Sequence, residues 1–349
     1  MIDLRVVRGV NGVEPLTVTH LKHAFNDFYG QAVRQMEPIG QGHVYLILTS
    51  EDYYVVKLFA DPEQLSWQAK CVTQLAENHV RGIVPFLANQ YDSIVNQYEE
   101  LIFGVMPYIP GKPLSLKHVN QQRDCLRLLA AFHRGGKGIY GRRPSLASQS
   151  VIYRQWQERL RQFKQTVGET EPFNGLDGSL LNLVRRHSAE VIEWAELALD
   201  KLPQTFLLYL EEQAQWERQI AHRDIVQHNV LVIDNKYYYL IDYDRVDYAP
   251  PYVDVVQFMH LALPYLGWQY AAVKELLDVY EEQRPFSPDE KRYLSLFLIY
   301  PDDFIREWLG VWQRKPAYHP QAAWHYFQRL DRQWEERRQF VRHCLAVLK

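Results

Sequence analysis

The stretch AHRDIVQHNVLVIDNKYYYLIDYD, from Ala221 to Asp244, places polar side chains at the ends of two apolar runs. The runs VLVID and YYYLID have the alternation of strands, and Asn235-Lys236 between them predicts a turn. A hairpin brings its two ends together, so we expect the cluster before the first run to lie beside Asp242. That cluster consists of His222, Asp224 and Asn229.

These residue types suit the transfer of a phosphoryl group. Magnesium prefers oxygen ligands, which Asn229 and Asp242 supply, and Asp224 then accepts the proton of an attacking hydroxyl. Asn229 follows Asp224 by five positions, the spacing of the kinase catalytic loop H-R-D-x-x-x-x-N. His222 is expected to act in the same loop by bracing it. The alternative for His222 is a metal pair with His228.

Composition narrows the class of protein. The chain has 349 residues, which predicts two domains or one bilobal unit, and 47% of them are hydrophobic, enough for a real core. A net charge of -3 gives no reason to expect a nucleic-acid partner. The three widely spaced cysteines favour buried thiols in a reducing interior over a disulfide framework or zinc site.

No apolar run reaches the roughly 18 residues that a membrane-spanning helix needs, and charges interrupt the N-terminal segment where a signal peptide would be apolar. We therefore expect a soluble, cytoplasmic protein without a membrane partner.

The periodicity along the chain predicts an α+β protein. Period-two runs predict strands over residues 31–40, 43–50, 53–60, 93–100 and 101–111. Asp61-Pro62 opens a helix between the third and fourth strands, and the pattern after residue 111 is mostly helical. The predicted domains are 1–108, a small antiparallel sheet with one inserted helix, and 109–349, a large mainly helical part.

The first part carries two further signals. Gly40 and Gly42 separate the first two strands, and Lys57 lies on the third. In kinases a glycine loop between these strands covers the phosphates of ATP and a lysine on the third strand contacts them. The alternatives are a plain hairpin turn and a solvated lysine.

Taken together, five segments resemble the aminoglycoside/choline phosphotransferase branch of the protein-kinase-like fold. They are VMPYIPGKPL, LLAAFHRGGKG, HRDIVQHN, LIDYD and PPYVDVVQF, and the resemblance spans about residues 35–265. It implies a bilobal kinase-like fold that uses ATP and Mg²⁺ on a small-molecule hydroxyl or amine acceptor.

The resemblance also implies positions. Adenine is expected against the backbone of Met106 to Ile109. Pro107 has no N–H, so Tyr108 or Ile109 is expected to donate to it. Asp254, in PPYVDVVQF, is expected to brace the catalytic loop. Residues 151–216 and LAAFHRGGKGIYG further resemble spore-coat CotS-type kinase-like proteins, which implies spore-coat proteins as partners and assembly onto the coat.

Two departures bear on function. The position expected for a glutamate partner of Lys57 is Gln68, and the glycine loop is sparse, with His43 and Val44 after Gly42. Both favour, as an alternative, a coat scaffold with little or no turnover. A protein kinase is disfavoured because residues 243–252 are too short for an activation segment ending in A-P-E.

An acidic group precedes the catalytic loop. It consists of Glu211, Glu212 and Glu217. A solvated face is one interpretation, and attraction of a cationic acceptor is the other.

Overall fold

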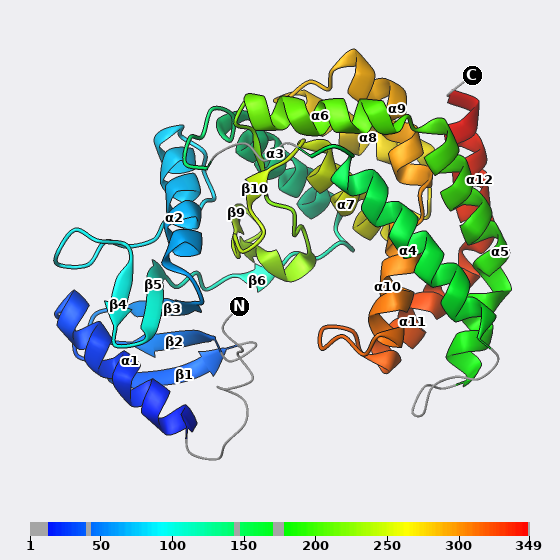
Figure 1. Ribbon diagram of the computed structural model, residues 1–349. Helices are drawn as coiled ribbons and strands as arrows, with labels where there is room; N and C mark the ends of the chain where they lie inside the picture. The colour runs from blue at the N-terminus through cyan, green and yellow to red at the C-terminus, as the bar shows by residue number, and fades with distance from the viewer. Residues whose placement is uncertain (1–12, 40–42, 143–146, 170–177, 348–349) are drawn as a thin grey trace. The chain divides into compact units, whose positions relative to one another are not determined.

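The computed structural model describes residues 13–39, 43–142, 147–169 and 178–347 (Figure 1). The chain divides into two compact units. The sheet unit comprises Met1–Leu114, Ile139–Arg143 and His228–Val246, and the helical unit comprises Ser115–Gly138, Pro144–Gln227 and Asp247–Lys349. The predicted α+β class, with a small antiparallel sheet and a helical remainder, is confirmed.

A five-stranded antiparallel sheet forms the centre of the sheet unit, with the order β1-β2-β3-β5-β4. Its strands are β1 (Gln35–Ile39), β2 (Val44–Leu48), β3 (Tyr53–Phe59), β4 (Asn96–Tyr98) and β5 (Leu101–Pro107). All five lie within runs that the alternating pattern predicted. In the central pairing, Lys57 of β3 lies opposite Gly104 of β5.

Helix α1 (Val13–Tyr29) packs on one face of this sheet (Figure 1). Its apolar stripe, with Phe25 at the centre, is buried against Ile47 and Val56. The helix ends at Gly30, whose φ of 66° is a conformation that glycine adopts without strain.

Helix α2 (Pro62–Glu77) covers the other face. The side chain of Asp61 accepts a hydrogen bond from the N–H of Glu63 at 2.9 Å, the cap predicted from Asp61-Pro62. A Cβ added to Gly104 would lie 2.8 Å from Leu65 of α2 and 2.7 Å from the ring of Phe86. Since directly opposite residues share a sheet face, Lys57 points to the side covered by α2.

A second, three-stranded sheet belongs to the same unit. Its order is β6-β8-β9, with β6 (Lys112–Pro113), β8 (Val230–Ile233) and β9 (Tyr237–Leu240). The predicted β8–β9 hairpin is present. Ile233 pairs with Tyr237, so the turn consists of the predicted Asn235 and Lys236 together with Asp234. Asp234 and Asn235 both have a φ of 52°. Asp and Asn tolerate this left-handed conformation better than most side chains do.

The two units therefore differ from the predicted domains 1–108 and 109–349. The β8–β9 hairpin joins the sheet unit because β8 pairs with β6 and the N–H of Leu240 donates to the carbonyl of Gly82 at 2.8 Å. The segment 139–143 joins it as well, since Arg142 lies over the ring of Trp67 at 5.0 Å. Both contacts join residues far apart in the sequence, which local periodicity cannot reveal.

The helical unit consists of ten α-helices and a two-stranded sheet within the described residues. The helices are α3 (Val119–Gly135), α4 (Val151–Gly168), α5 (Gly178–Lys201), α6 (Gln204–Trp216), α7 (Tyr252–Ala262), α8 (Tyr270–Glu281), α9 (Pro288–Ile299), α10 (Asp302–Trp312), α11 (Pro320–Arg332) and α12 (Trp334–Val347). The strands are β7 (Ile220–Ala221) and β10 (Asp247–Tyr248), which pair antiparallel.

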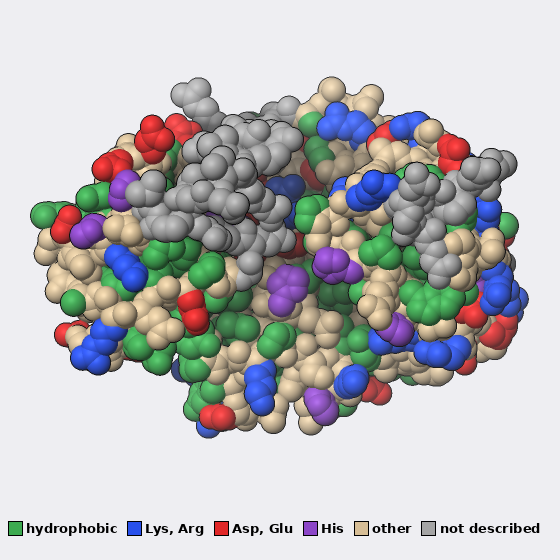
Figure 2. Space-filling model, turned by 90° about the horizontal axis from the view of Figure 1, so that it is seen from below, with side chains coloured by type: hydrophobic (Ala, Val, Ile, Leu, Met, Phe, Trp, Pro, Cys, Tyr) green, Lys and Arg blue, Asp and Glu red, His purple; other side chains and the backbone are tan. Residues whose placement is uncertain are grey.

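Large aromatic side chains fill the core of this unit. Trp156 of α4 stacks on Tyr300 at 4.0 Å between ring centroids, and Tyr252 of α7 stacks on Phe297 of α9 at 4.3 Å. Across the described ranges, no helix combines the length and apolar character needed to cross a membrane. On the face shown in Figure 2, acidic and basic side chains are interspersed.

The close contact at Gly104 gives a test of the fold. We expect Gly104→Ala to destabilise the protein by about 1–3 kcal/mol, because the new methyl group overpacks the space between β5 and α2. Thermal or urea denaturation measures the change. Gly168→Ala, at a site with no atom within 4 Å of the added Cβ, is the control and should change stability by less than about 1 kcal/mol. Equal stability of the two variants would contradict the tight packing of α2.

Candidate active site

The two ends of the β8–β9 hairpin lie together, as predicted. Val230 pairs with Leu240, and the N–H of Ile241 donates to the carbonyl of Asn229 at 3.0 Å. Asp242 is the next residue along, and Asn229 is almost completely buried. The hairpin thus brings an amide and a carboxylate to one end of a rigid ribbon.

Lys57 reaches the same place from β3. Its Nζ atom lies 2.6 Å from Oδ1 of Asp242 and 2.6 Å from Oδ1 of Asp244. Only 8% of the lysine side chain is exposed. The alternative of a solvated edge lysine is therefore wrong, because a buried ammonium needs the charged partners that this one has.

Asp244 was not among the residues predicted for the site. It is the second acid of Asp242-Tyr243-Asp244, and that alternation was the one signal available in the sequence. Gln68 of α2, itself 1% exposed, donates from Nε2 to Oδ1 of Asp244 at 3.1 Å. Gln68 occupies the helix position expected to carry a glutamate for Lys57. It contacts Asp244, the acid that pairs with the lysine.

The backbone is strained at two of these positions. Asp242 and Arg223, the residue before Asp224, both have a φ of 65°. Side chains other than glycine rarely adopt this conformation, and such residues concentrate at functional sites.

Asn229 and Asp242 fit the requirements of a magnesium ion. Magnesium in phosphoryl-transfer sites is bound by one or two protein oxygens together with phosphate oxygens and water. The described part of the chain contains no group of three His, Cys, Asp or Glu side chains able to hold a metal. A metal pair of His222 and His228 thus lacks a third ligand of these types.

The segment after β5 corrects one adenine-binding prediction. The N–H of Tyr108 donates to the carbonyl of Tyr53 at 3.1 Å, so it is not available as the donor. Ile109, whose carbonyl accepts the N–H of Gly111 at 2.8 Å, has an N–H that makes no hydrogen bond among the described residues. Of the two predicted donors, Ile109 is therefore the one that fits. Met106 lies in β5 opposite Val55.

Gly40 and Gly42 lie outside the described residues, so the proposed glycine loop remains a prediction.

In the helical unit, α7 holds the backbone on both sides of Asp224. Asp254 accepts the N–H of His222 and the N–H of Arg223, each at 2.7 Å. Gln257, one turn further along α7, accepts the N–H of Ile225 at 3.0 Å. Two side chains of one helix face thus fix the loop that carries Asp224. Gln257 was not predicted.

The ring of His222 is completely buried and lies against the ring of Phe132, 6.2 Å between centroids. This burial favours the bracing role over direct contact with a substrate.

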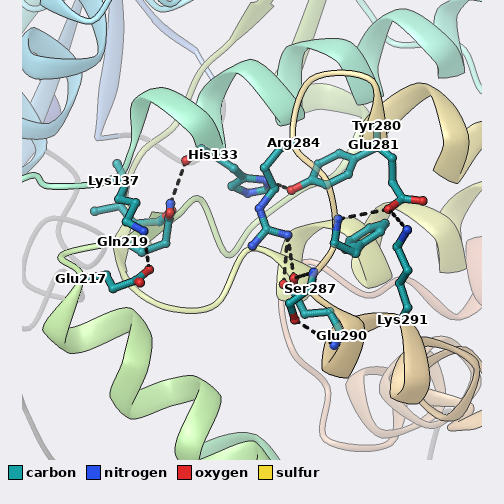
Figure 3. Close-up of polar contacts among 12 residues, drawn as sticks. His133, Lys137, Glu217, Gln219, Tyr280, Glu281, Arg284, Ser287, Glu290 and Lys291 are labelled. Carbon is teal, nitrogen blue, oxygen red and sulfur yellow. Dashed lines mark hydrogen bonds and ion pairs between the residues drawn. The ribbon is translucent and has the colours of Figure 1, made fainter.

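His133 connects Asp254 to further residues of the helical unit, of which Figure 3 shows Tyr280, Arg284 and Glu290. Its Nε2 lies 2.9 Å from Oδ2 of Asp254, and its Nδ1 lies 2.8 Å from the hydroxyl of Tyr280. Arg284 also hydrogen-bonds Tyr280 and forms a two-pronged ion pair with Glu290 of α9. A neutral His133 that donates from Nε2 and accepts at Nδ1 satisfies every partner.

Burial governs the protonation of this network. Burial alone would raise the pKa of Asp254, but the hydrogen bonds from His133 and from the loop N–H groups outweigh it and lower the pKa. Burial lowers the pKa of His133 below its ordinary value of 6.5, against the opposing effect of Asp254. The result is a carboxylate anion held by a neutral imidazole and two backbone donors.

The acidic group before the loop has structural partners. Glu211 accepts hydrogen bonds from the hydroxyl of Ser150 and from the first N–H groups of α4, at 2.7 to 3.1 Å. Glu217 pairs with Lys137 at 2.9 Å. Glu211 therefore caps α4, and attraction of a cationic acceptor by this acidic group stays a prediction.

Arg306 of α10 interacts electrostatically with Asp224, which the sequence did not reveal. Burial would lower the pKa of its guanidinium, but nearby negative groups, including Asp302 and Asp224, raise it. The ion pair of Arg306 is with Asp302, whose Oδ2 lies 3.7 Å from Nη1.

Comparison with known proteins agrees with this arrangement. A model of the phosphotransferase enzyme family matches residues 38–294, well over half of the chain. The chain belongs to the phosphotransferase enzyme family. The match includes Lys57, both acids of the hairpin end and the whole catalytic loop. The resemblance inferred from the sequence is therefore confirmed at the level of this family.

Solved structures share the fold of this phosphotransferase-family chain. An aminoglycoside phosphotransferase from Alicyclobacillus acidocaldarius is similar with a TM-score of 0.71 and 17% identity, over 92% of this chain and 94% of that one. The AMP-bound complex of a spectinomycin phosphotransferase is similar with a TM-score of 0.61 and 18% identity, over 89% and 94%. An amicoumacin kinase in complex with AMP-PNP and Ca²⁺ is similar with a TM-score of 0.55 and 11% identity, over 94% and 95%.

The neutral, buried His133 predicts a pH dependence of stability. Its folded pKa is lower than its unfolded pKa, so its contribution is complete above pH 6.5 and is lost as the pH falls below that value. We expect the free energy of unfolding to fall between pH 7.5 and 5.5, by at most about 1.4 kcal/mol per pH unit from this group. Denaturation at a series of pH values measures it.

The matched variants are His133→Asn and His228→Asn. An asparagine at position 133 still offers Asp254 a donor but cannot titrate, so the loss of stability on acidification should be smaller. The exposed His228 should give the wild-type profile when replaced. Identical pH profiles for His133→Asn and the wild type would contradict the assignment.

Proposed function

We propose that the protein transfers a phosphoryl group from ATP to a hydroxyl or amine of a small molecule. The observation that carries this proposal is the buried Lys57 ammonium paired with Asp242, at the hairpin end where Asn229 also lies. A lysine from the sheet and oxygen ligands from a hairpin are the groups that kinases direct at the phosphates and the metal.

Within this proposal each residue has one task. Lys57 binds phosphate oxygens of ATP, and the N–H of Ile109 donates to the adenine. Asn229 and Asp242 hold magnesium, which when bound neutralises the charge that develops on the transferred phosphate.

Asp224 acts on the acceptor. The acceptor oxygen or nitrogen forms a bond to the γ-phosphorus while the bond to the β-phosphate oxygen breaks, and ADP leaves. The proton of the acceptor passes to Asp224. The hydrogen bonds from Arg223 and Ile225 to α7 hold the backbone on both sides of Asp224, which keeps the carboxylate in position without help from the substrate.

A small acceptor is favoured over a peptide by the chain after Asp242. Only nine residues separate Asp242 from the first residue of α7, Tyr252, and they include the short strand β10. Kinases that bind peptides use a long activation segment in this place.

The alternative of an inactive coat scaffold rested on Gln68 and on the sparse glycine loop, which lies partly outside the described residues. Asp244 supplies Lys57 with a second carboxylate, so the glutamine does not leave the lysine without a counter-ion and the main argument for lost catalysis is weakened. Assembly onto a spore coat, and spore-coat proteins as partners, remain predictions from the resemblance to CotS-type proteins.

Asp224→Asn tests the proton-accepting role. We expect turnover to fall about 10²–10⁴-fold with nucleotide affinity unchanged, because asparagine keeps the shape but cannot take the proton. The measurement is ATP consumption in the presence of a panel of hydroxylated and aminated metabolites. Asp234→Asn, in the turn of the hairpin, is the control and should keep wild-type turnover. Wild-type turnover in Asp224→Asn would remove this residue from the reaction.

Asp242→Asn tests the metal site. Asparagine tolerates the left-handed backbone at this position, so the variant should fold. We expect the magnesium-dependent part of ATP binding, measured by calorimetry, to disappear. Retention of that part would show that other residues hold the metal.

A further inference from the structure

We infer that Asp244 is a positioning residue for Lys57, and that Gln68 of α2 acts by orienting Asp244. This inference rests on the proposed function, because it concerns how the lysine is presented to phosphate. In kinases a glutamate on the helix holds the lysine directly. In this chain the helix would act through an intermediate: Gln68 donates to Asp244, and Asp244 pairs with the lysine.

The geometry at Asp244 supports an intermediate of this kind. A single oxygen, Oδ1, accepts from Nζ of Lys57 at 2.6 Å and from Nε2 of Gln68 at 3.1 Å. The two donors are almost completely buried, while the Asp244 side chain is 38% exposed. An exposed aspartate is free to adopt several rotamers, and two donors from buried, ordered side chains select one of them.

Helix α2 holds the segment after the hairpin at a second point. Trp67, the neighbour of Gln68, donates from Nε1 to the carbonyl of Val246 at 2.9 Å, and this hydrogen bond is buried. Adjacent residues of one helix therefore hold positions 244 and 246. The helix fixes the backbone with Trp67 and the carboxylate with Gln68.

There is also a chemical reason why Lys57 needs a second carboxylate partner. The same lysine contacts Asp242, which the proposed function assigns to magnesium. Once a divalent cation shares the charge of Asp242, that residue neutralises the lysine less well. Asp244 then remains as the counter-ion that holds a buried ammonium in place.

An exchange of charge between positions 244 and 68 tests the inference. Asp244→Asn removes the counter-ion but keeps the side-chain shape, and Gln68→Glu places a carboxylate on α2. We expect Asp244→Asn to bind ADP about tenfold more weakly than the wild type, both with magnesium and with magnesium removed by chelation. The double variant, with both changes, should recover most of the lost affinity, because the new glutamate can pair with Lys57 directly.

Calorimetry with ADP, with and without magnesium, is the measurement, and thermal denaturation confirms that each variant is folded. Gln64→Glu combined with Asp244→Asn is the matched control. It adds the same charge one turn earlier on α2, and it should not restore binding.

Three results would overturn the inference. One is an Asp244→Asn variant that binds ADP as tightly as the wild type. Another is a loss of ADP affinity that appears only when magnesium is present, which would make Asp244 a metal ligand instead. The third is a folded double variant that binds ADP no more tightly than Asp244→Asn does. A wild-type protein that binds no nucleotide at all would be a different outcome, since it would remove the proposed function itself.

Discussion

The buried ammonium of Lys57, between the carboxylates of Asp242 and Asp244, is the interaction on which the sheet unit's site depends. A charge this deeply buried is costly unless it is paired. Its partners lie far along the chain, so the pairing requires β3, α2 and the β8–β9 hairpin to be assembled together. The small sheet of β6, β8 and β9 places the hairpin, and α2 holds the segment that follows it.

The helical unit follows the same principle with a buried anion. Asp254 is completely buried, and it stays ionised because donors surround it: two backbone N–H groups of the catalytic loop and His133. His133 is in turn held by Tyr280, which connects to Arg284 and Glu290. Such a network is stable only when every member is satisfied. The position of Asp224 is therefore tied to residues of α8 and α9 that no substrate would touch.

Each of these centres is held by buried groups of its own unit. Under the proposed function, Lys57, Asn229 and Asp242 act on phosphate and metal, and Asp224 acts on the acceptor. The similar solved structures are named for an aminoglycoside, for spectinomycin and for amicoumacin. Membership in the phosphotransferase family thus establishes the kind of chemistry more firmly than the acceptor.

The sequence by itself determined the local elements and the spacing of the chemical groups. Alternation predicted β1 to β5 and the hairpin, Asp61-Pro62 predicted the start of α2, and the five-residue step from Asp224 to Asn229 predicted the loop. These signals depend on neighbouring residues alone, so a sequence displays them directly.

Only the tertiary structure decided which distant groups meet. Lys57 and Asp242 are 185 positions apart, Gln68 and Asp244 are 176 apart, and His133 and Tyr280 are 147 apart. The alternation of Asp242 and Asp244 was a weak local signal, but no local pattern shows that Asp244 pairs with Lys57 or that the N–H of Tyr108 is already bonded to Tyr53. Pairings of this kind follow from the packing of whole elements, because a buried charge selects its partner by proximity in space and not by distance along the chain.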